Sequence, residues 1–564
     1  MSEKRDALYE TVGKLNPTEA VSRQGMVTGT TGSAAVEAGV DMLRQGGSAA
    51  DAAAATALTQ ICLAAGSWVS YAGIYSLVYF EASTGKLHNL NAGFNTIRAE
   101  DDPLAIPGPN LGDLGKGGLS AFQYAASGRT ALVPGFMAGI EATHRRFGKL
   151  PLQAIFDPAI RYAEEGFPWT AGHAQQYAFR ASVLSRLPRT QEVFAKADGS
   201  TYAAGENFRQ PALARTLRRT AAEGIREYLY CGEWADALVA AVRADGGKMT
   251  LADLRDYEVI WSEPTHASYH GYDIYSHGLP AAGGVCLTEA MNLAELAELS
   301  SKRRYSESPE ALFWLAQIAK PAFVLGSAPI ADAAGLQAAI RSLGIDLSLS
   351  SRLDKRTSKA LWDAIRSGRL PGIGAPAAVP AHSDSVVAID QWGNMAAVVH
   401  SINTVSWGST GIFVEGISIP DSAAFQQQAV AAAGPGRRLP DPTNPGLVLR
   451  NGKPVMAFGS IGAGLHIRTV GSLIGVLDFG LTPQQAINEP SIGCFEMGGI
   501  GRLTVGAKEF PPEFLEAVRN LGQDVVESDP LRGYWIGIQI DPVTGELHGG
   551  AIRELAMGGR AVGY

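Results

Sequence analysis

The stretch 381–403, AHSDSVVAIDQWGNMAAVVHSIN, decides the fold because it predicts a β-hairpin. Two short apolar runs rich in β-branched residues, Val386–Ile389 and Met395–Val399, have the composition of buried strands. The residues between them predict a turn, since Gly393 and Asn394 both tolerate a positive φ. We therefore expect two antiparallel strands joined at residues 391–394.

The pairing of this hairpin determines which polar side chains meet at its open end. If Asp390 pairs with Met395, Ser383 falls opposite Ile402, and Ser401 and Asn403 lie beside it. A hydroxyl at the start of one strand would then meet a hydroxyl and an amide at the end of the other.

The segment before the hairpin has a different character. Residues 371–380, PGIGAPAAVP, interrupt any regular element. A loose linker that enters a strand beginning with Ser is what an N-terminal-nucleophile hydrolase precursor needs. The bond before Ser383 can break, and the freed α-amino group can act as base for its own hydroxyl. The alternative is a surface loop that enters an ordinary strand, and the hairpin alone does not choose between the two.

Residues 383–394 resemble the start of the small subunit in the γ-glutamyltranspeptidase family, TTHxSVVDxxGN. The shared DxxGN end, from Asp390 to Asn394, places Ser383 at the family's nucleophile. Ser385 is the alternative nucleophile, because it has the same chemistry and faces the same side of the strand. Residues 46–53, GGSAADAA, are similar to the family's opening GGNAxDAA.

This resemblance implies an α+β fold, the αββα sandwich of two stacked sheets flanked by helices. It also implies a zymogen that cuts itself between His382 and Ser383, with His382 a candidate for assisting the cut. Residues 1–382 would form the large subunit, ending in a linker over about 345–382, and residues 383–564 the small one. The two fragments would stay together as one folded unit.

The resemblance also assigns the catalytic helpers. Ser401-Ile402-Asn403 takes the place of the family's Thr-Leu-Asn, which orients the nucleophile. Residues 459–464, GSIGAG, take the place of GSPGGS, so the backbone amides of Gly462 and Ala463 would bind the oxyanion. An α-amino group has a pKa near ~7.7–8.0, which suits a base at neutral pH. Ser401 and Asn403 are alternatively interpreted as caps at the end of a strand, and residues 459–464 as an ordinary glycine-rich turn.

Three departures from the family concern the substrate. The family's carboxylate-binding Arg is missing from residues 90–95, LNAGFN, and its Ser-Ser pair is replaced by Asp441-Pro442. Its NQxxD stretch for the α-amino group is replaced by residues 419–425, IPDSAAF. An α-carboxylate without a partner would be costly to bury. We therefore expect an amide substrate other than a γ-glutamyl compound, with candidate contacts from Asp421, Ser422, Asp441 and His466. Asp421 and Asp441 are equally well interpreted as loop caps.

Composition excludes several other functions. The 564 residues carry a formal net charge of −8 with no basic run, which argues against nucleic acid. No apolar run reaches the ~18 residues of a membrane span, and the charged start predicts no signal peptide, so we expect a cytoplasmic protein. We expect no cofactor and no metal, since His266 and His270 lie in a strand-like segment. The four cysteines have no metal or redox spacing and are expected to be free thiols: Cys62, Cys231, Cys286 and Cys494.

Three functional hypotheses follow. The first is an autoprocessed amidohydrolase or acyltransferase that acts on a small-molecule amide. The second is a true γ-glutamyltransferase or glutathione hydrolase, with a carboxylate clamp from Arg98 or Arg437. The third is an uncleaved, non-catalytic homologue, because Ser-Asp-Ser replaces Thr-Thr-His. The number of large–small units in the assembly, including a homodimer, is left open by the sequence.

Overall fold

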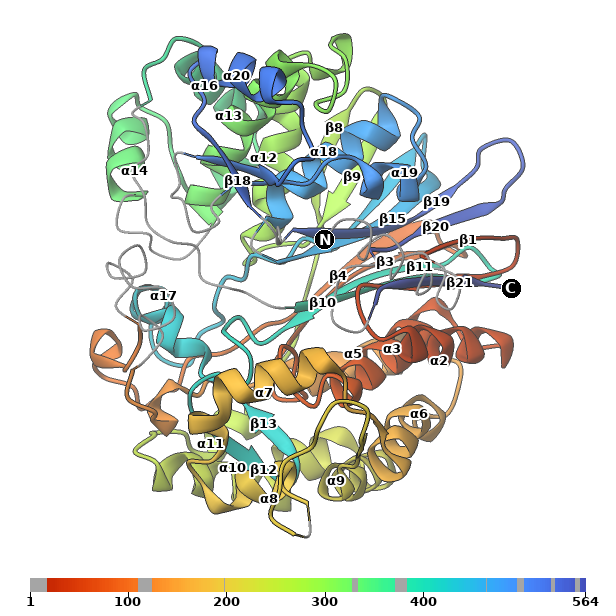
Figure 1. The fold of residues 1–564 in the computed structure, drawn as a ribbon, viewed down its shortest axis with the longest axis vertical. Helices are drawn as coiled ribbons and strands as arrows, with labels where there is room; N and C mark the ends of the chain where they lie inside the picture. The colour runs from red at the N-terminus through yellow and green to blue at the C-terminus, as the bar shows by residue number, and fades with distance from the viewer. Residues whose placement is uncertain are drawn as a thin grey trace.

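The computed structural model describes residues 18–109, 124–196, 198–326, 333–370, 383–462, 464–494, 502–528, 533–552 and 558–564. Two large sheets lie face to face in the middle of the molecule, and helices cover the outer face of each (Figure 1). This is the four-layer αββα arrangement expected from the sequence.

The first large sheet has seven strands, and its neighbouring strands pair antiparallel. Its strand order is β1 (Glu19–Ser22), β20 (Leu547–Gly550), β19 (Tyr534–Ile540), β15 (Lys453–Ile461), β14 (Gly446–Arg450), β9 (Tyr272–Ser276) and β8 (Thr265–Tyr269).

The second large sheet also has seven antiparallel strands. Its strand order is β21 (Arg560–Gly563), β2 (Met26–Gly29), β10 (Ser383–Ile389), β11 (Met395–Ser401), β3 (Ile74–Glu81), β4 (Lys86–Ala92) and β7 (Ile260–Ser262). Both sheets therefore combine strands from before and after residue 383.

The predicted hairpin is confirmed, with its register shifted by one residue. Ile389 pairs with Met395, so Ser383 lies opposite Ser401 and not opposite Ile402. The shift arises because Asp390 belongs to the turn. Its carboxylate accepts the backbone N–H groups of Trp392 and Asn394, each at 3.0 Å. The two hydroxyls therefore face each other directly.

One helical layer packs on the outer face of the second sheet. It is built around the alanine-rich α3, which has no polar face and is buried along its whole length. Its helices are α2 (Ser33–Arg44), α3 (Ala49–Leu63), α5 (Phe136–Phe147), α6 (Leu152–Glu165), α7 (Ala171–Leu184), α8 (Pro188–Phe194), α9 (Pro211–Glu223), α10 (Glu233–Ala244) and α11 (Leu251–Arg255). Around them lie β5 (Phe167–Pro168), β6 (Asn207–Phe208), β12 (Ile412–Val414), β13 (Ile417–Ile419), η1 (Pro103–Ala105), η4 (Gly128–Thr130), η5 (Arg226–Tyr230), η7 (Ser422–Phe425) and α17 (Gln427–Ala433).

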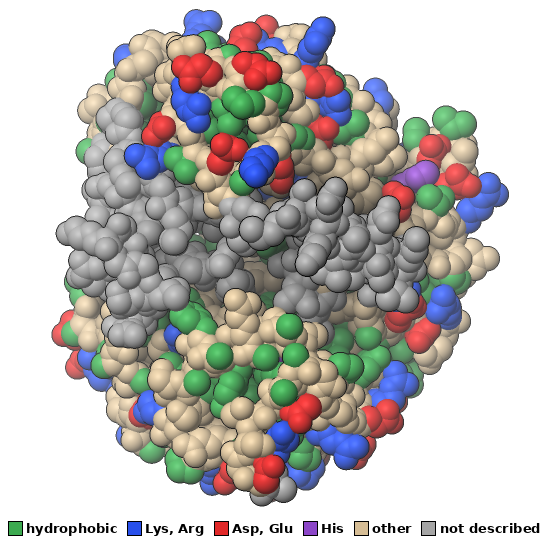
Figure 2. Space-filling model, viewed as in Figure 1, with side chains coloured by type: hydrophobic (Ala, Val, Ile, Leu, Met, Phe, Trp, Pro, Cys, Tyr) green, Lys and Arg blue, Asp and Glu red, His purple; other side chains and the backbone are tan. Residues whose placement is uncertain are grey.

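The other helical layer covers the first sheet. Its helices are α12 (Gly283–Leu296), α13 (Pro309–Gly326), α14 (Ala333–Ser342), α15 (Leu349–Arg352), α16 (Lys355–Arg366), α18 (Leu465–Leu477), α19 (Pro483–Asn488) and α20 (Pro512–Asn520). With them lie η6 (Leu299–Ser301) and a small sheet of β16 (Ile492–Cys494), β17 (Leu503–Gly506) and β18 (Val525–Ser528). Acidic and basic side chains alternate over this layer on the face that Figure 2 shows.

Two expectations about local structure need correction. The strand-like segment expected around His266 and His270 is two strands, β8 and β9, because the chain turns at His270 and Gly271, both of which have positive φ. The linker expected over about 345–382 is helical in its first part, where α15 and α16 lie. The Pro/Gly-rich residues 371–382 are outside the described residues.

The space between the two sheets is filled from one end by an apolar core. Its side chains come from alternate positions of the facing strands, for example Val387 and Ile389 of β10 against Leu447 of β14 and Ile538 of β19. Along β10, the next two side chains on the same face are Ser385 and Ser383. The layer therefore changes from apolar to polar toward the start of β10.

Candidate active site

Ser383 is fixed by contacts with the end of the neighbouring strand. Its Oγ donates to the Oγ of Ser401 at 2.9 Å. The backbone N–H of Asn403 donates to the same Ser401 oxygen at 3.0 Å. Asn403 has a left-handed φ of 50°, which turns the chain back after β11 and aims this N–H at Ser401. The structure thus brings together Ser383, Ser401 and Asn403, whose roles as nucleophile and orienting residues stay predictions.

Ser385 lies on the same face of β10 but deeper between the sheets. Its hydroxyl donates to the carbonyl of Val398 at 2.8 Å, and the residue is fully buried. A Cβ added at Gly459 of β15 would lie 2.0 Å from this Oγ, so only glycine fits there. Ser385 is covered by the facing sheet, whereas Ser383, at the strand's end, is partly exposed.

The glycine-rich segment begins at the end of β15, the strand that packs against β10. Gly462 has a φ of 85°, which ends the strand. Ser460 pins this end, because its hydroxyl donates to the carbonyl of Tyr534 at 2.8 Å. Ala463 lies outside the described residues, as does His382. The pair of oxyanion amides and the role of His382 therefore stay predictions.

Asp421 and Ser422 lie just behind the turn that follows β11. The Ser422 hydroxyl donates to the carbonyl of Ile402 at 2.7 Å. The buried Asp421 carboxylate accepts the hydroxyls of Thr404, at 2.5 Å, and of Tyr124. Burial and then the charge of Asp421 raise the pKa of the Tyr124 phenol, so it stays protonated and keeps donating.

A positive charge also faces Asp421. The buried guanidinium of Arg180 interacts electrostatically with Asp421, and it donates to Ser409 Oγ at 2.8 Å and to the carbonyl of Gly408. Two hydroxyl donors and one cation therefore already serve the Asp421 carboxylate. The Asp421 carboxylate therefore has less hydrogen-bonding capacity left for the ammonium group of a substrate.

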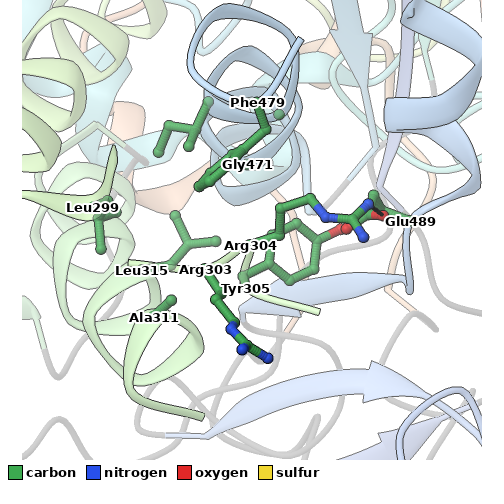
Figure 3. Close-up of a pocket in the computed structure, with 11 residues that line it drawn as sticks. Leu299, Arg303, Arg304, Tyr305, Ala311, Leu315, Gly471, Phe479 and Glu489 are labelled. Atoms are coloured by element: carbon green, nitrogen blue, oxygen red, sulfur yellow. Dashed lines mark hydrogen bonds and ion pairs between the residues drawn. The ribbon is translucent and has the colours of Figure 1, made fainter. Parts of the chain in front are cut away.

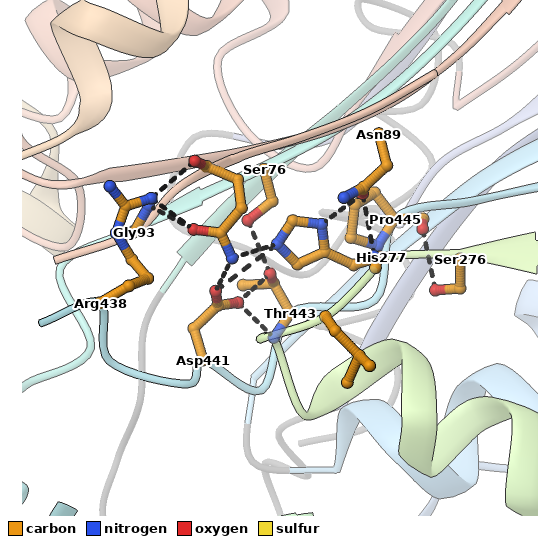
Figure 4. Close-up of polar contacts among 12 residues, drawn as sticks. Ser76, Asn89, Gly93, Ser276, His277, Arg438, Asp441, Thr443 and Pro445 are labelled. Atoms are coloured by element: carbon orange, nitrogen blue, oxygen red, sulfur yellow. Dashed lines mark hydrogen bonds and ion pairs between the residues drawn. The ribbon is translucent and has the colours of Figure 1, made fainter. Parts of the chain in front are cut away.

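Asp441 belongs to a separate polar cluster between the sheets (Figure 4). Its carboxylate accepts the backbone N–H of Thr443 at 3.0 Å and lies 3.6 Å from Nε2 of His277. His277 Nδ1 is 2.8 Å from Asn89 Oδ1, and its Nε2 is 3.1 Å from Asn91 Nδ2. Burial opposes ionisation of Asp441, but His277 and Thr443 hold its pKa below the ordinary value.

Arg438 is the guanidinium that lies against residues 90–95 (Figure 4). It donates from Nη1 to Asn91 Oδ1 at 2.8 Å, from Nε to Asn95 Oδ1 at 2.7 Å, and from Nη2 to the carbonyl of Glu258 at 2.6 Å. Residues 90–95, which lack the family's arginine, are thus contacted by Arg438. The N–H groups of Arg438 named here already donate to acceptors of the protein itself.

His466 lies in the first turn of α18 and is buried. Burial, and then the charge of Arg352, lower its pKa to about 3, so the imidazole is neutral at neutral pH. Arg352 itself forms a fully buried bidentate pair with Glu289, at 2.7 and 3.0 Å. His466 therefore lies close enough to Arg352, in the helical layer over the first sheet, to be affected by its charge.

Asp384 is the residue on the opposite face of β10 from Ser383. Its Oδ1 accepts the hydroxyls of Thr31, at 2.6 Å, and Thr30, at 3.0 Å. Its Oδ2 accepts the indole N–H of Trp68 at 3.0 Å. Burial raises the pKa of Asp384 to about 7, against the effect of these three donors.

A small pocket lies in the helical layer over the first sheet (Figure 3). It has a volume of about 20 Å³ and lies between α13 and α18. Its rim arginine, Arg304, is paired with Glu307 and Glu489. It is too small for an amide substrate and is distinct from the candidate active site.

The histidines expected not to bind metal are paired with carboxylates in the described residues. His266 is 2.8 Å from Asp273, and His270 is 2.8 Å from Asp478, so each histidine has a carboxylate of its own. The described ranges hold no cluster of three or more His, Cys, Asp or Glu side chains that could bind a metal ion. Within the same ranges, every helix is too short or too polar to cross a bilayer.

Two face-to-face antiparallel sheets between helical layers, with a hydroxyl at the first residue of a central strand, define the class of N-terminal-nucleophile folds. A family model described as Gamma-glutamyltranspeptidase matches residues 35–553. The chain therefore belongs to the γ-glutamyltranspeptidase family, a family of enzymes, as the sequence motifs indicate.

The relatives carry two kinds of name. A glutathione hydrolase proenzyme of Pseudomonas sp. (strain A14) is 28% identical over 504 residues, which span 83% of this chain and 81% of that protein. The Acylase ACY 1 proenzyme of Pseudomonas sp. (strain SE83) is 27% identical over 442 residues, or 76% of this chain and 75% of that protein. The crystal structure of cephalosporin acylase from Bacillus halodurans matches the fold with a TM-score of 0.77, at 24% identity, over 97% of each chain.

Sequence reasoning missed several residues of this region. Asp384 lies within a quoted segment and Arg438 does not, and the partners of both lie hundreds of residues away in the chain. One signal was available for Asp384, since an acidic residue at a buried position of a central strand needs donors to be tolerated. No sequence signal links Arg180 or His277 to the site.

Proposed function

We propose that this protein is an autoprocessed amidohydrolase or acyltransferase in which Ser383 is the nucleophile. The observation that carries the proposal is the direct contact between Ser383 Oγ and Ser401 Oγ at the partly exposed start of β10. Relatives support it, because several of them are named as proenzymes. The large and small fragments of one chain are then the two parts of the enzyme.

In the proposed reaction, the free α-amino group of Ser383 accepts the proton of the hydroxyl while Oγ bonds to the carbonyl carbon of the amide. The resulting oxyanion is bound by backbone amides at the end of β15, where we place Gly462 and Ala463. The C–N bond then breaks, and the leaving amine takes the proton from the α-amino group. Water, or a second amine in a transfer reaction, releases the acyl group from Ser383 by the same steps.

We propose further that the acyl group lacks the amino-acid head of a γ-glutamyl compound. Arg438 is engaged by Asn91 and Asn95, and Asp421 by Thr404 and Tyr124. Arg98, an alternative carboxylate partner, is exposed and pairs with Asp256 at 2.5 Å. Binding an amino acid's two charges here would require breaking existing hydrogen bonds, which is costly in a buried site.

Electrophoresis and N-terminal sequencing test the nucleophile. The 564-residue chain should give fragments of 382 and 182 residues, and the small fragment should begin at Ser383. Ser383→Ala should leave the chain intact, while Ser385→Ala, the matched control two residues further on, should still be cut. An intact wild-type chain after long incubation would favour the uncleaved homologue, and the reverse result for the two variants would move the nucleophile to Ser385.

A glutathione hydrolase is the second candidate, because several relatives have that name. Three p-nitroanilides separate the candidates: γ-glutamyl, glutaryl, which lacks the amino group, and butyryl, which lacks both charges. We expect kcat/KM for the γ-glutamyl compound to be no higher than for the other two. A clear preference for γ-glutamyl-p-nitroanilide would establish the second candidate.

A further inference from the structure

The first residues of β10 are held in an unusual way. On one side, Ser383 to Ile389 all pair with β11. On the other side, pairing with β2 begins only at Val386, opposite Gly29. Among the described residues, Ser383 and Asp384 thus have no strand partner on the β2 side, at the end of the strand that carries the proposed nucleophile.

The segment Thr30–Thr31, which follows β2, replaces the missing strand. The backbone N–H of Thr30 donates to the carbonyl of Ser385 at 3.1 Å, and the N–H of Ser385 donates to Thr30 Oγ1 at 2.9 Å. Asp384 adds its carboxylate, which accepts from Thr30, Thr31 and Trp68. All of these groups are buried.

We propose that Asp384 is a positioning residue: with Thr30, Thr31 and Trp68 it clamps the start of β10 from behind, so that Ser383 stays in line with Ser401 once its amine is free. This inference rests on the proposed role of Ser383. We call the four side chains the Asp384 clamp.

The physical need for the clamp follows from the proposed cut. A residue that becomes a chain terminus loses the restraint of the preceding peptide bond, and terminal strand residues fray unless they are tied down. Ser383 and Asp384 point to opposite faces, so the clamp restrains the backbone without occupying the space where substrate would bind. Small displacements of a reacting group are expensive, since about 1 Å can cost ~10²-fold in rate.

The Asp384 carboxylate of the clamp titrates in a different pH range from the histidines beside it. The titratable side chains facing it are His400, directly opposite on β11, and His173 of α7, which stacks on Trp68 with ring centroids 6.2 Å apart. Burial lowers the pKa of His400 to about 3 and that of His173 to about 4. Both are neutral above pH 5, so among the described side chains named here only Asp384 titrates near pH 7, together with the terminal amine.

The first test compares Thr31→Val with Thr59→Val in the cleaved protein. Both threonines are buried and each loses one hydroxyl bond, but Thr59 donates to the carbonyl of Ala55 inside α3. The probe is p-nitrophenyl acetate, whose nitrophenolate burst reports acylation of the nucleophile, with Ser383→Ala as blank. We expect Thr31→Val to slow the burst about tenfold and to speed amide hydrogen exchange in the peptide that starts at Ser383. Thr59→Val should change neither.

A second pair of variants keeps the test decisive if Thr31→Val does not fold properly. Trp68→Phe removes the indole donor to Asp384, and Trp234→Phe removes an indole donor to the carbonyl of Val414. We expect a slower burst in Trp68→Phe alone. Equal burst rates and equal exchange within both pairs would overturn the clamp, even if Ser383→Ala abolishes the burst and the proposed function stands.

The pH profile gives a readout that a purely structural role would not move. If the Asp384 carboxylate and the terminal amine both matter, the acid limb of the logarithm of burst rate against pH is steeper than one in the wild type. Asp384→Asn should return this slope to one and lower the rate at pH 8. An unchanged slope would refute a role for Asp384, while absence of any burst in a chain that stays intact would instead refute the proposed function.

Discussion

The two ends of the layer between the sheets are built from the same strands and the same faces, yet they serve different purposes. At one end, Val387 and Ile389 of β10 meet Leu447 and Ile538 in a dry, apolar core. At the other end, Ser383 and the cluster around Asp441 face a layer of hydroxyl, amide and carboxylate groups. The comparison teaches that one alternating pattern can build, in a single strand, a rigid support and the polar edge at which we propose that the reaction takes place.

The two ends should differ most in how strongly a substitution lowers the reaction rate. Ser383→Ala should lower turnover and acylation by about 10⁴-fold or more, because the reacting atom is lost, while leaving urea unfolding unchanged within about 0.5 kcal/mol. Burst kinetics and equilibrium unfolding measure the two effects. Full activity in this variant would contradict the division between the ends.

At the apolar end, a substitution should lower the stability of the protein and leave its reaction rate nearly unchanged. Ile538→Ala removes a fully buried side chain from the apolar core and should lower the free energy of unfolding by about 2–5 kcal/mol. The rate per folded molecule should change less than about twofold. Urea unfolding with matched activity assays measures both, and a large loss of rate at full folding would show that the ends are coupled.

The boundary between the ends can be tested at Gly459. Gly459→Ala should cost about 1–3 kcal/mol in unfolding free energy, because the new Cβ meets Ser385 Oγ. Ser385→Ala removes that oxygen, so the double variant should be more stable than the two single effects predict. A double-mutant cycle by urea unfolding measures the coupling, and strict additivity would mean that the sheets separate locally to relieve the contact.

The smallest expected effect concerns Asp441. Its pKa is lowered in the folded state, so it stabilises the protein above the unfolded pKa of about 3.9, and this contribution is lost as pH falls through the lower folded value. Asp441→Asn should therefore show a shallower loss of unfolding free energy between pH 5 and pH 3 than the wild type. Parallel curves would show that His277 and Thr443 do not stabilise the ionised form.

Local patterns predicted the hairpin because strands have a short period. Its two strands, β10 and β11, follow from residues close together in the sequence. The predicted strand register was wrong by one residue, because the Asp390 side chain caps the turn and extends it.

The polar surroundings could not be predicted in the same way. The contacts from Thr31 to Asp384 and from Arg438 to Asn91 join residues about 350 positions apart. Such pairs depend on the order of strands in the sheets, and no local pattern encodes that order. Residues 371–382 and Ala463, on which the cut and the oxyanion site depend, are outside the described residues.

The interleaved strand order has a mechanical consequence. β10 and β11 lie between β2 and β3, while β20 pairs with β1 and β14 with β9, so each prospective fragment supplies neighbours to the other in both sheets. Parting the fragments would mean tearing several ladders of backbone hydrogen bonds at once. The proposed scission before Ser383 would therefore leave a nicked molecule that copurifies as one particle.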